Sequence, residues 1–440
     1  MKTSFLQKKL ATFFYFLRIK KNVILNPTIK EELYLNRDYK NKLSFRSAAR
    51  NLTTPCYHRF RDSLLRFGIT DKSNDVILKR SEESHNSLIP QELRFFTSFR
   101  MTRKVEFFKL NSVKIFLLII IFSTINLFSQ VQENINQIIG SAYTESQAYD
   151  FLQRLCDEAG GRLAGSTENE KGISILAEEL NKIGISSKLE IFTMNSWKRA
   201  DDNVEIITPI SKKLRVYALG YAPKTSEFTS ELVFLNCGTD EDFKNIDSKG
   251  KICLVTLETP KGAEQQFRCE VVERATNSGA KAVLFINTKN GGLNLCGTSN
   301  FSGEEAKIPA FSITYEEGSS LKRLLKKGIP VKMKIKVNSQ CFKTETSNII
   351  VTFPGESAKK IVVGAHFDSW DVSQGAVDNG HGTAILFDIA RLINRYSPKN
   401  YYTIELVWFN AEELGLFGSK EYAEKHSDET IAMINLDMPG

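Results

Sequence analysis

Apolar and polar positions follow a regular order from residue 348 to residue 440. Three apolar runs have the composition of strands, and the stretches between them are amphipathic, as is typical of helices. In chain order these segments are KIVVGAH, TAILFDIARLINRY, YYTIELVWFNAEE, LGLFGSKEYAEKH and TIAMINLDM. Strands that alternate with helices favour parallel pairing, because each crossover places a helix on a face of the sheet. We therefore predict an α/β fold with a mostly parallel sheet and helices on both faces.

Residues 138–200 carry two further helical patterns. The segment TESQAYDFLQRLCDEAGGRLAGS opens with a capping-box pattern from Thr144 to Gln147, and Gly160–Gly161 end the predicted helix. A second helix ends at Gly184, and the extended stretch KLEIFTMNSW follows. The apolar residues expected to face a core are Tyr149, Leu152, Leu155, Ile173, Leu176, Ala177, Leu180 and Ile183. Two amphipathic helices cannot close a core alone, so we expect this segment to pack on residues 344–440 as one domain.

Residues 201–343 have a different character, with short apolar runs separated by glycine, lysine and polar turns. The runs ELVFLNCG, GKICLVTLE, AKAVLFIN and IPAFSIT read as strands, and residues 264–278 and LKRLLKKG read as helices. We predict a smaller β-rich or mixed domain, inserted into the first and built on its own core. The segment shows no cluster of titratable residues, which favours a structural or substrate-shaping role.

The net charge of +8 is concentrated in residues 1–100, which hold 20 Lys/Arg and 9 Asp/Glu. This segment has one glycine, Gly68, and no long periodic window. A basic arm for nucleic acid is one interpretation, but no recognition motif accompanies the charge. We therefore predict no nucleic-acid partner and interpret residues 1–100 as an extension upstream of the biological start.

That start is predicted at Met101. A positively charged stretch precedes an apolar run from Ile115 to Phe128, and the small residue Ser129 follows. This order is typical of a secretory signal peptide over residues 101–129, with an uncleaved signal anchor as the alternative. We expect a secreted or periplasmic protein that meets a membrane only through this segment. Six of the seven cysteines follow it, and their spacing leaves disulfides and free buried thiols equally open.

The chemistry-bearing residues gather at the ends of the three predicted strands. The residues concerned are His366, Asp368 and Asp378 after the first strand, Glu412 and Glu413 after the second, and Asp437 at the end of the third. In such sheets ligands bind outside the carboxyl ends of the strands. Each residue alone has an ordinary explanation as a cap or a helix-dipole partner. Their joint placement indicates a metal site, and histidine mixed with carboxylates favours Zn²⁺.

The two adjacent glutamates provide one general base and one metal ligand. One carboxylate must stay off the metal to take a proton from the attacking water. Asp368, two residues after His366, is placed to fix the tautomer of that histidine. No role is predicted for Asp371.

The stretches HFDSWDVSQGAVDNGHG, WFNAEELGLFGS and NLDM resemble the co-catalytic zinc exopeptidase family, and the first is especially similar to the carboxypeptidase Q branch. The segment RLAGS is similar to the family's N-terminal region, and the insert resembles a protease-associated domain. The resemblance covers residues 138–440.

The resemblance implies a zinc-dependent exopeptidase: a carboxypeptidase, aminopeptidase or dipeptidase acting on a peptide or dipeptide, with a homodimer left open. It also implies two Zn²⁺ per intact site and a cis peptide bond after Asp378. One ion would lie on His366, Asp378 and Asp437, and the other on Asp378 and Glu413. Glu412 would be the general base for a metal-activated water, and Asp368 the support of His366.

One feature departs from the family. Its second zinc takes a histidine well downstream of NLDM, whereas this chain ends at Gly440, and its four other histidines are poorly placed. We therefore expect a C-terminally truncated second peptidase segment over residues 344–440. The alternatives are a non-catalytic binding or receptor-like homologue, an inactive truncated fragment and a single-zinc aminoacyl cyclase.

Overall fold

The computed structural model describes residues 134–259, 264–396 and 399–439. They fall into two units, of which the first contains the described residues 134–145, with a helix over 134–144. The second contains residues 146–439. The predicted upstream extension and signal segment lie outside the described residues. Among the helices that are described, none is long and apolar enough to cross a membrane.

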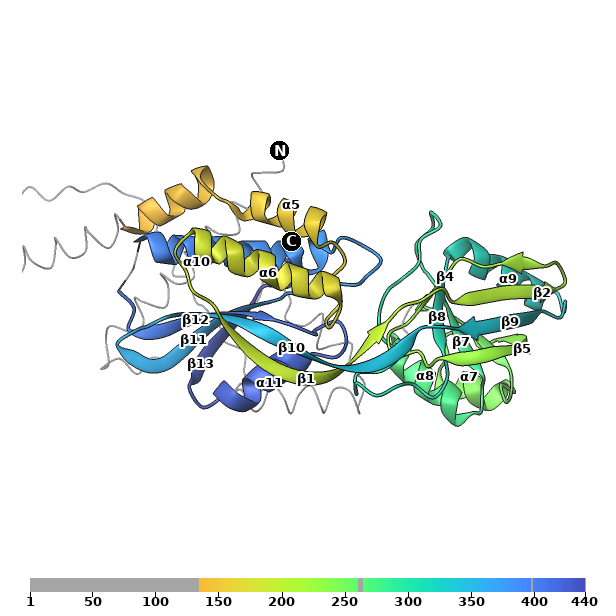
Figure 1. Cartoon of the computed structure of the whole chain (residues 1–440). Coiled ribbons are helices and arrows are strands. Elements are labelled where there is room, and N and C mark those ends of the chain that lie inside the picture. Colours follow the sequence, from red (N-terminus) through yellow and green to blue (C-terminus); the bar gives the residue numbers. More distant parts are fainter. Residues whose placement is uncertain (1–133, 260–263, 397–398, 440) are drawn as a thin grey trace, which may run out of the picture. The chain divides into compact units, whose positions relative to one another are not determined.

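A five-stranded sheet, here called the main sheet, carries the predicted strand ends (Figure 1). Its order is β1-β10-β12-β11-β13. Strand β11 pairs in parallel with its neighbours β12 and β13, whereas β10 runs antiparallel to β1 and β12. The α/β class is thus confirmed, and the sheet is mixed. The bounds are β1 (Lys188–Lys198), β10 (Gln340–Phe353), β11 (Ser357–His366), β12 (Tyr402–Phe409) and β13 (Thr430–Asn435).

Helices cover both faces of the main sheet, as expected. Figure 1 shows α5, α6 and α10 over one face and α11 under the other. On the first face, Phe151 of α5 packs on Phe387 of α10, with ring centroids 4.7 Å apart. The bounds are α5 (Ala148–Glu158), α6 (Thr167–Lys182), α10 (His381–Tyr396) and α11 (Phe417–His426).

The first predicted helix is displaced from its expected register. No capping box forms at Thr144, which instead donates a hydrogen bond to the carbonyl of Gly140. Because α5 begins only at Ala148, its buried face contains Phe151 and Leu155, and Tyr149 is 51% exposed. In α6 the cap is Ser166, whose side chain accepts a hydrogen bond from the Asn169 amide.

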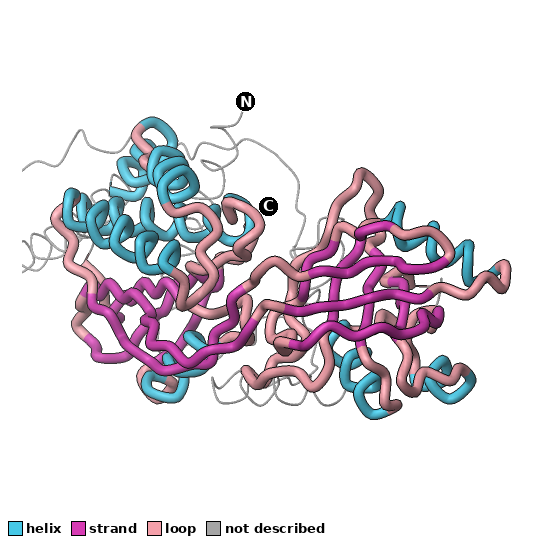
Figure 2. Tube along the Cα trace, turned by 45° about the vertical axis from the view of Figure 1, so that its right-hand side comes forward, coloured by secondary structure: helices cyan, strands magenta, loops and turns pink. Residues whose placement is uncertain are grey.

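The insert contains an eight-stranded sheet of order β3-β2-β9-β5-β6-β7-β8-β4 (Figure 2). Strands β5 to β8 are parallel neighbours, and β6, β7 and β8 are buried along their whole length. The strand bounds are β2 (Asn203–Thr208), β3 (Lys212–Lys213), β4 (Val216–Ala218), β5 (Thr225–Phe234), β6 (Ile252–Thr256), β7 (Ala282–Ile286), β8 (Ala310–Ile313) and β9 (Lys332–Val337). The helices are α7 (Asp240–Asn245), α8 (Arg268–Asn277) and α9 (Tyr315–Lys326).

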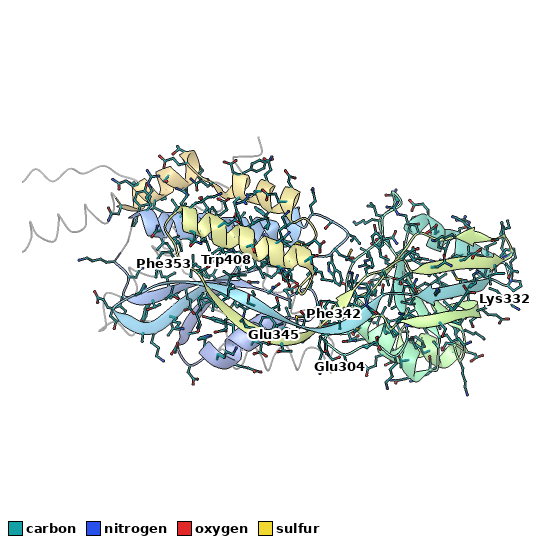
Figure 3. The ribbon with its side chains drawn as sticks, viewed as in Figure 1. Glu304, Lys332, Phe342, Glu345, Phe353 and Trp408 are labelled. Atoms are coloured by element: carbon teal, nitrogen blue, oxygen red, sulfur yellow. The ribbon has the colours of Figure 1, made fainter. Side chains whose placement is uncertain are left out.

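Two paired strands carry the chain into and out of the insert. The chain leaves the main sheet at the end of β1 and returns at the start of β10, where Lys198 lies opposite Gln340. Figure 3 labels Phe342 and Phe353 along β10, and Lys332 on β9 of the insert. The carboxylate of Asp202 fixes the crossing, because it accepts hydrogen bonds from the backbone amides of residues 338 and 339, at 2.7 and 2.9 Å.

Candidate metal centre

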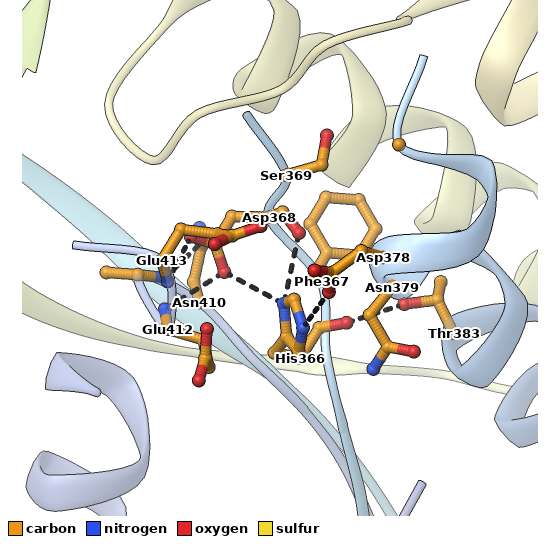
Figure 4. A network of polar contacts seen from close by, with 12 residues as sticks. His366, Phe367, Asp368, Ser369, Asp378, Asn379, Thr383, Asn410, Glu412 and Glu413 are labelled. Carbon is orange, nitrogen blue, oxygen red and sulfur yellow. Dashed lines mark hydrogen bonds and ion pairs between the residues drawn. The ribbon is translucent and has the colours of Figure 1, made fainter. Parts of the chain in front are cut away.

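At the end of β11, His366 lies beside Asp378 (Figure 4). His366 is 3% exposed, and its Nε2 lies 3.0 Å from Asp378 Oδ1 and 3.6 Å from Asp437 Oδ1. The possible ligand atoms of these three residues all lie within 4.8 Å of one another. The structure therefore brings together three of the four predicted metal ligands.

The Nδ1 atom of His366 faces the opposite way, toward Asp368. It lies 3.1 Å from the Asp368 carbonyl oxygen and 3.6 Å from the carboxylate. With its proton on Nδ1, the ring donates to that carbonyl and turns the Nε2 lone pair toward the two aspartates. The backbone of Asp368 is thus the group that orients the ring.

The carboxylate of Asp368 holds the glutamate pair. It is fully buried and accepts hydrogen bonds from the backbone amides of Glu412 and Glu413, at 3.0 and 3.2 Å. One aspartate therefore connects the end of β11, which carries His366, to the turn after β12.

A network of buried amides anchors that turn at Asn410. The Asn410 side chain donates to Thr346 Oγ1 at 2.7 Å and to Asn169 Oδ1 at 2.9 Å, while its backbone amide donates to Asn348 Oδ1 at 3.1 Å. The next residue, Ala411, has a positive φ of 59°. Such a conformation persists only where its surroundings determine it. The sequence does not predict this network, because Asn410 lies 62 positions from Asn348 and 241 from Asn169.

Asn379 positions the third strand end. Its side chain donates to the Leu436 carbonyl at 2.7 Å and accepts from the Met438 amide at 3.2 Å, so it holds the residues on both sides of Asp437. The peptide bond between Asp378 and Asn379 is cis, as the resemblance implied.

Burial controls the electrostatics of the glutamate pair. Desolvation, reinforced by neighbouring carboxylates, raises the pKa of Glu412 to about 7 and raises that of Glu413 well above its ordinary value. Burial lowers the pKa of His366, but its contacts with the surrounding aspartates outweigh this and raise that pKa. Among the described residues, Glu413 Oε1 is buried without a hydrogen-bond partner. An orphaned carboxylate oxygen beside other acids is what a cation site requires.

One protein cation lies behind the cluster but does not pair with it. The side chain of Arg162 donates only to backbone carbonyls, those of Phe367 at 2.7 Å, Gln374 at 3.1 Å, and Gly160 and Gly375 at 3.2 Å each. It is fully buried, and desolvation lowers its pKa to about 10. Among the described residues no salt bridge joins Arg162 to these acids, although the charges of Asp368, Glu413 and Asp378 act to raise its pKa. The imidazole and carboxylate donors fit Zn²⁺.

A cavity of ≈390 Å³ opens beside the cluster. Asp378 and the glutamate pair line one side, and residues of the insert, among them Arg268 and Gly297, line another. The insert was expected to shape the substrate site without titratable groups of its own, but it contributes the guanidinium of Arg268.

Two family models match the chain. Residues 348–440 match peptidase family M28, and residues 228–321 match the PA domain. Carboxypeptidase Q of Bos taurus is 26% identical over 308 residues, which cover 68% of this chain and 65% of that protein. Aminopeptidase YwaD of Bacillus subtilis is 29% identical over 309 residues, covering 68% and 62%.

Solved structures agree with these matches. The aminopeptidase from Aneurinibacillus sp. strain AM-1 is similar with a TM-score of 0.53 and 29% identity, covering 66% of this chain and 69% of that one. BSAP, a zinc aminopeptidase from Bacillus subtilis, gives a TM-score of 0.54 and 28% identity, with 67% and 69% covered. The resemblance to zinc exopeptidases with a protease-associated insert is thus confirmed. The chain spans less than two thirds of the length of the curated relatives named above.

Proposed function

We propose that this chain, which carries a region matching peptidase family M28, forms the metal centre of a zinc-dependent exopeptidase that hydrolyses a terminal peptide bond. The observation that carries the proposal is the convergence of His366, Asp378 and Asp437 at one sheet edge. A half-buried glutamate pair and a cavity adjoin them. A sheet edge without metal-binding residues, or with a single aspartate at a strand end, would not support this proposal.

The roles of the residues follow from their surroundings. When bound, zinc would polarise the carbonyl of the scissile bond and lower the pKa of the attacking water. His366, Asp378, Asp437 and Glu413 are proposed to hold two ions, with Asp378 shared. The pKa of Glu412, raised to about 7, suits it to take a proton from the water and to return it to the leaving amine.

The cavity favours a substrate with a free carboxylate. The side chain of Arg268 lines the cavity and forms no hydrogen bond or ion pair within the described residues. Burial lowers its pKa, and Glu413 acts in the opposite direction. An unpaired guanidinium prefers a planar anion that it can bind with two hydrogen bonds. We therefore propose a carboxypeptidase or dipeptidase, in agreement with the name of the relative carboxypeptidase Q.

The competing assignment is an aminopeptidase, which the similarity to YwaD supports. Dipeptides with one blocked end distinguish the two. We expect amidation of the carboxyl end to reduce kcat/KM at least about tenfold and acetylation of the amino end to have a smaller effect. The substitution Arg268→Met should raise KM for the free dipeptide but not for its amide. The opposite order of the two blocked substrates would identify an aminopeptidase.

The catalytic assignment is tested with Glu412→Gln. We expect kcat to fall by about 10²–10⁴-fold while the zinc content, measured by atomic absorption, stays that of the wild type. A wild-type chain that binds zinc but cleaves no peptide would favour the non-catalytic homologue. We also propose export through residues 101–129. N-terminal sequencing of the natural product tests this, because peptides from residues 1–100 would contradict it.

A further inference from the structure

Asp371, to which the sequence assigns no role, has a partner far away in the chain. Its carboxylate binds Arg199 with two contacts, Nε to Oδ2 at 2.8 Å and Nη2 to Oδ1 at 3.0 Å. Paired hydrogen bonds of this kind fix orientation as well as distance. The side chain of Asp371 is 28% exposed and that of Arg199 is 12% exposed.

Arg199 is held firmly on its own side. Its guanidinium lies over the rings of Trp197 and Tyr217, with the central carbon 4.8 and 5.3 Å from their centroids. It also donates to the carbonyl of Ala218. The Asp202 carboxylate fixes the crossing into the insert three residues further on. Arg199 is therefore a rigid anchor at the entrance to the insert.

The loop that carries Asp371 is attached at its ends to a different element. Arg162 binds the carbonyls of Phe367 and Gln374, and the backbone of the loop lies on Gly161, where a Cβ would come within 2.8 Å of the Asp371 carbonyl. Arg162 thus holds the two ends of the loop, and Arg199 holds its middle.

The residue before Asp371 is Trp370, which lines the cavity and is 7% exposed. Its ring packs on Gly220 of the insert, where a Cβ would come within 3.0 Å of the ring. Gly220 exchanges backbone hydrogen bonds with Gly297 and Ser299, donating to the first and accepting from the second, at 2.9 Å each. The position of Trp370 therefore couples the loop to the cavity wall that the insert provides.

We infer that Asp371 and Arg199 are positioning residues, which set the place of Trp370 and with it the shape of the cavity beside the metal centre. The inference rests on the proposed function for its kinetic consequence but not for its structural one. An exposed ion pair would contribute little. This pair differs because it is bidentate, is stacked on two rings and joins segments that are distant in sequence.

The structural consequence is measured by fluorine NMR of the full chain labelled with 5-fluorotryptophan. The chain has three tryptophans, so the spectrum has three lines to assign. In Asp371→Asn we expect the lines of Trp370 and Trp197 to move. The line of Trp408, which is fully buried in β12, should stay and serves as the internal reference. The matched control is Asp240→Asn, which removes an arginine-bound aspartate of the insert and should move no line.

The kinetic consequence is a split between KM and kcat. For Asp371→Asn we expect KM to rise roughly tenfold and kcat to stay within about twofold, because the metal ligands are untouched. Arg199→Lys, which keeps the charge but loses the bidentate contact, should act in the same direction. The double variant Asp371→Arg with Arg199→Asp, which exchanges the two residues, should reverse part of the rise in KM.

Two results would overturn the inference: a Trp370 line in Asp371→Asn that coincides with that of the wild type, or an unchanged KM in both single variants. If Asp371→Asn does not fold, Arg199→Lys decides by the same two measurements. If the wild-type chain cleaves no peptide, the proposed function fails, while the fluorine spectra still decide whether the pair positions Trp370.

Discussion

Replacing Arg162 by methionine tests whether burial or ion pairing determines how much an arginine contributes to the free energy of unfolding of this protein. Methionine keeps much of the side-chain volume but leaves four backbone carbonyls without their donor. A hydrogen bond to a charged group contributes about 1.5–3 kcal/mol, so four contribute roughly 6–12 kcal/mol before other costs. Taking the guanidinium out of water costs several kcal/mol, which the variant regains. We expect a net loss of about 3–5 kcal/mol in the free energy of unfolding.

The assay is urea denaturation followed by tryptophan fluorescence. With an m value of about 3 kcal/mol/M, a loss of about 4 kcal/mol lowers the midpoint by about 1.3 M. Arg154→Met is the matched control. Arg154 contacts three carboxylates, those of Glu158, Glu178 and Glu179, but its side chain is 26% exposed. With about 0.3 kcal/mol for each of the three pairs, this variant should lose about 1 kcal/mol and shift the midpoint by about 0.3 M. Equal shifts, or a larger one for Arg154→Met, would refute the reasoning.

Three further outcomes are expected. Asn379→Ala should weaken zinc binding by about 10–100-fold, measured by competition with a chelator, because the segment around Asp437 loses its anchor; unchanged affinity would contradict this. The raised pKa of Glu412 means that the fold favours the protonated carboxyl, and this contribution is complete below about pH 4.5 and lost as the pH rises to about 7. The midpoint of thermal unfolding of the zinc-free chain should therefore fall between pH 4.5 and about 7, and that of the zinc-loaded chain should fall less. Equal falls in the two forms over this pH range would contradict the assignment. Gly297→Ala should raise KM for free-carboxylate dipeptides and leave the zinc content unchanged, because the glycine has a φ of 146° and an added Cβ would meet the Arg268 guanidinium; an unchanged KM would count against the placement of Arg268.

The sequence predicts the metal cluster well because its information is local. Each apolar run ends in a residue with metal-binding chemistry, and parallel pairing brings those ends to one edge. Three of the four predicted ligands, His366, Asp378 and Asp437, converge, and Glu413 lies outside that group. Their roles, and that of Glu412, remain predictions.

The supports of the cluster could not be predicted, since their partners are remote. Asn410 binds Asn169, 241 positions away, and no local pattern distinguishes this asparagine from one in a turn. Arg162 lies in a segment that is similar to the family's N-terminal region, but three of the four carbonyls that it binds belong to the remote loop after β11. The sequence does not predict the antiparallel strand β10, because its first eight residues, QCFKTETS, are too polar for a clear apolar alternation.

The paired strands β1 and β10 have a consequence for the order of folding. To place Lys198 opposite Gln340 the chain must close a loop of 142 residues, the difference of the two positions. In a flexible chain the length-dependent entropy cost is about 4.4 kcal/mol. If the insert folds first, its antiparallel strands β2 and β9 already hold Asn203 opposite Lys336, and only the short connections on either side are left to close. These connections span 5 and 4 positions, the differences 203−198 and 340−336, and for nine residues the same relation gives about 1.9 kcal/mol, less than half of the original cost. An insert that folds first would thus bring the two strands of the crossing side by side before the main sheet forms.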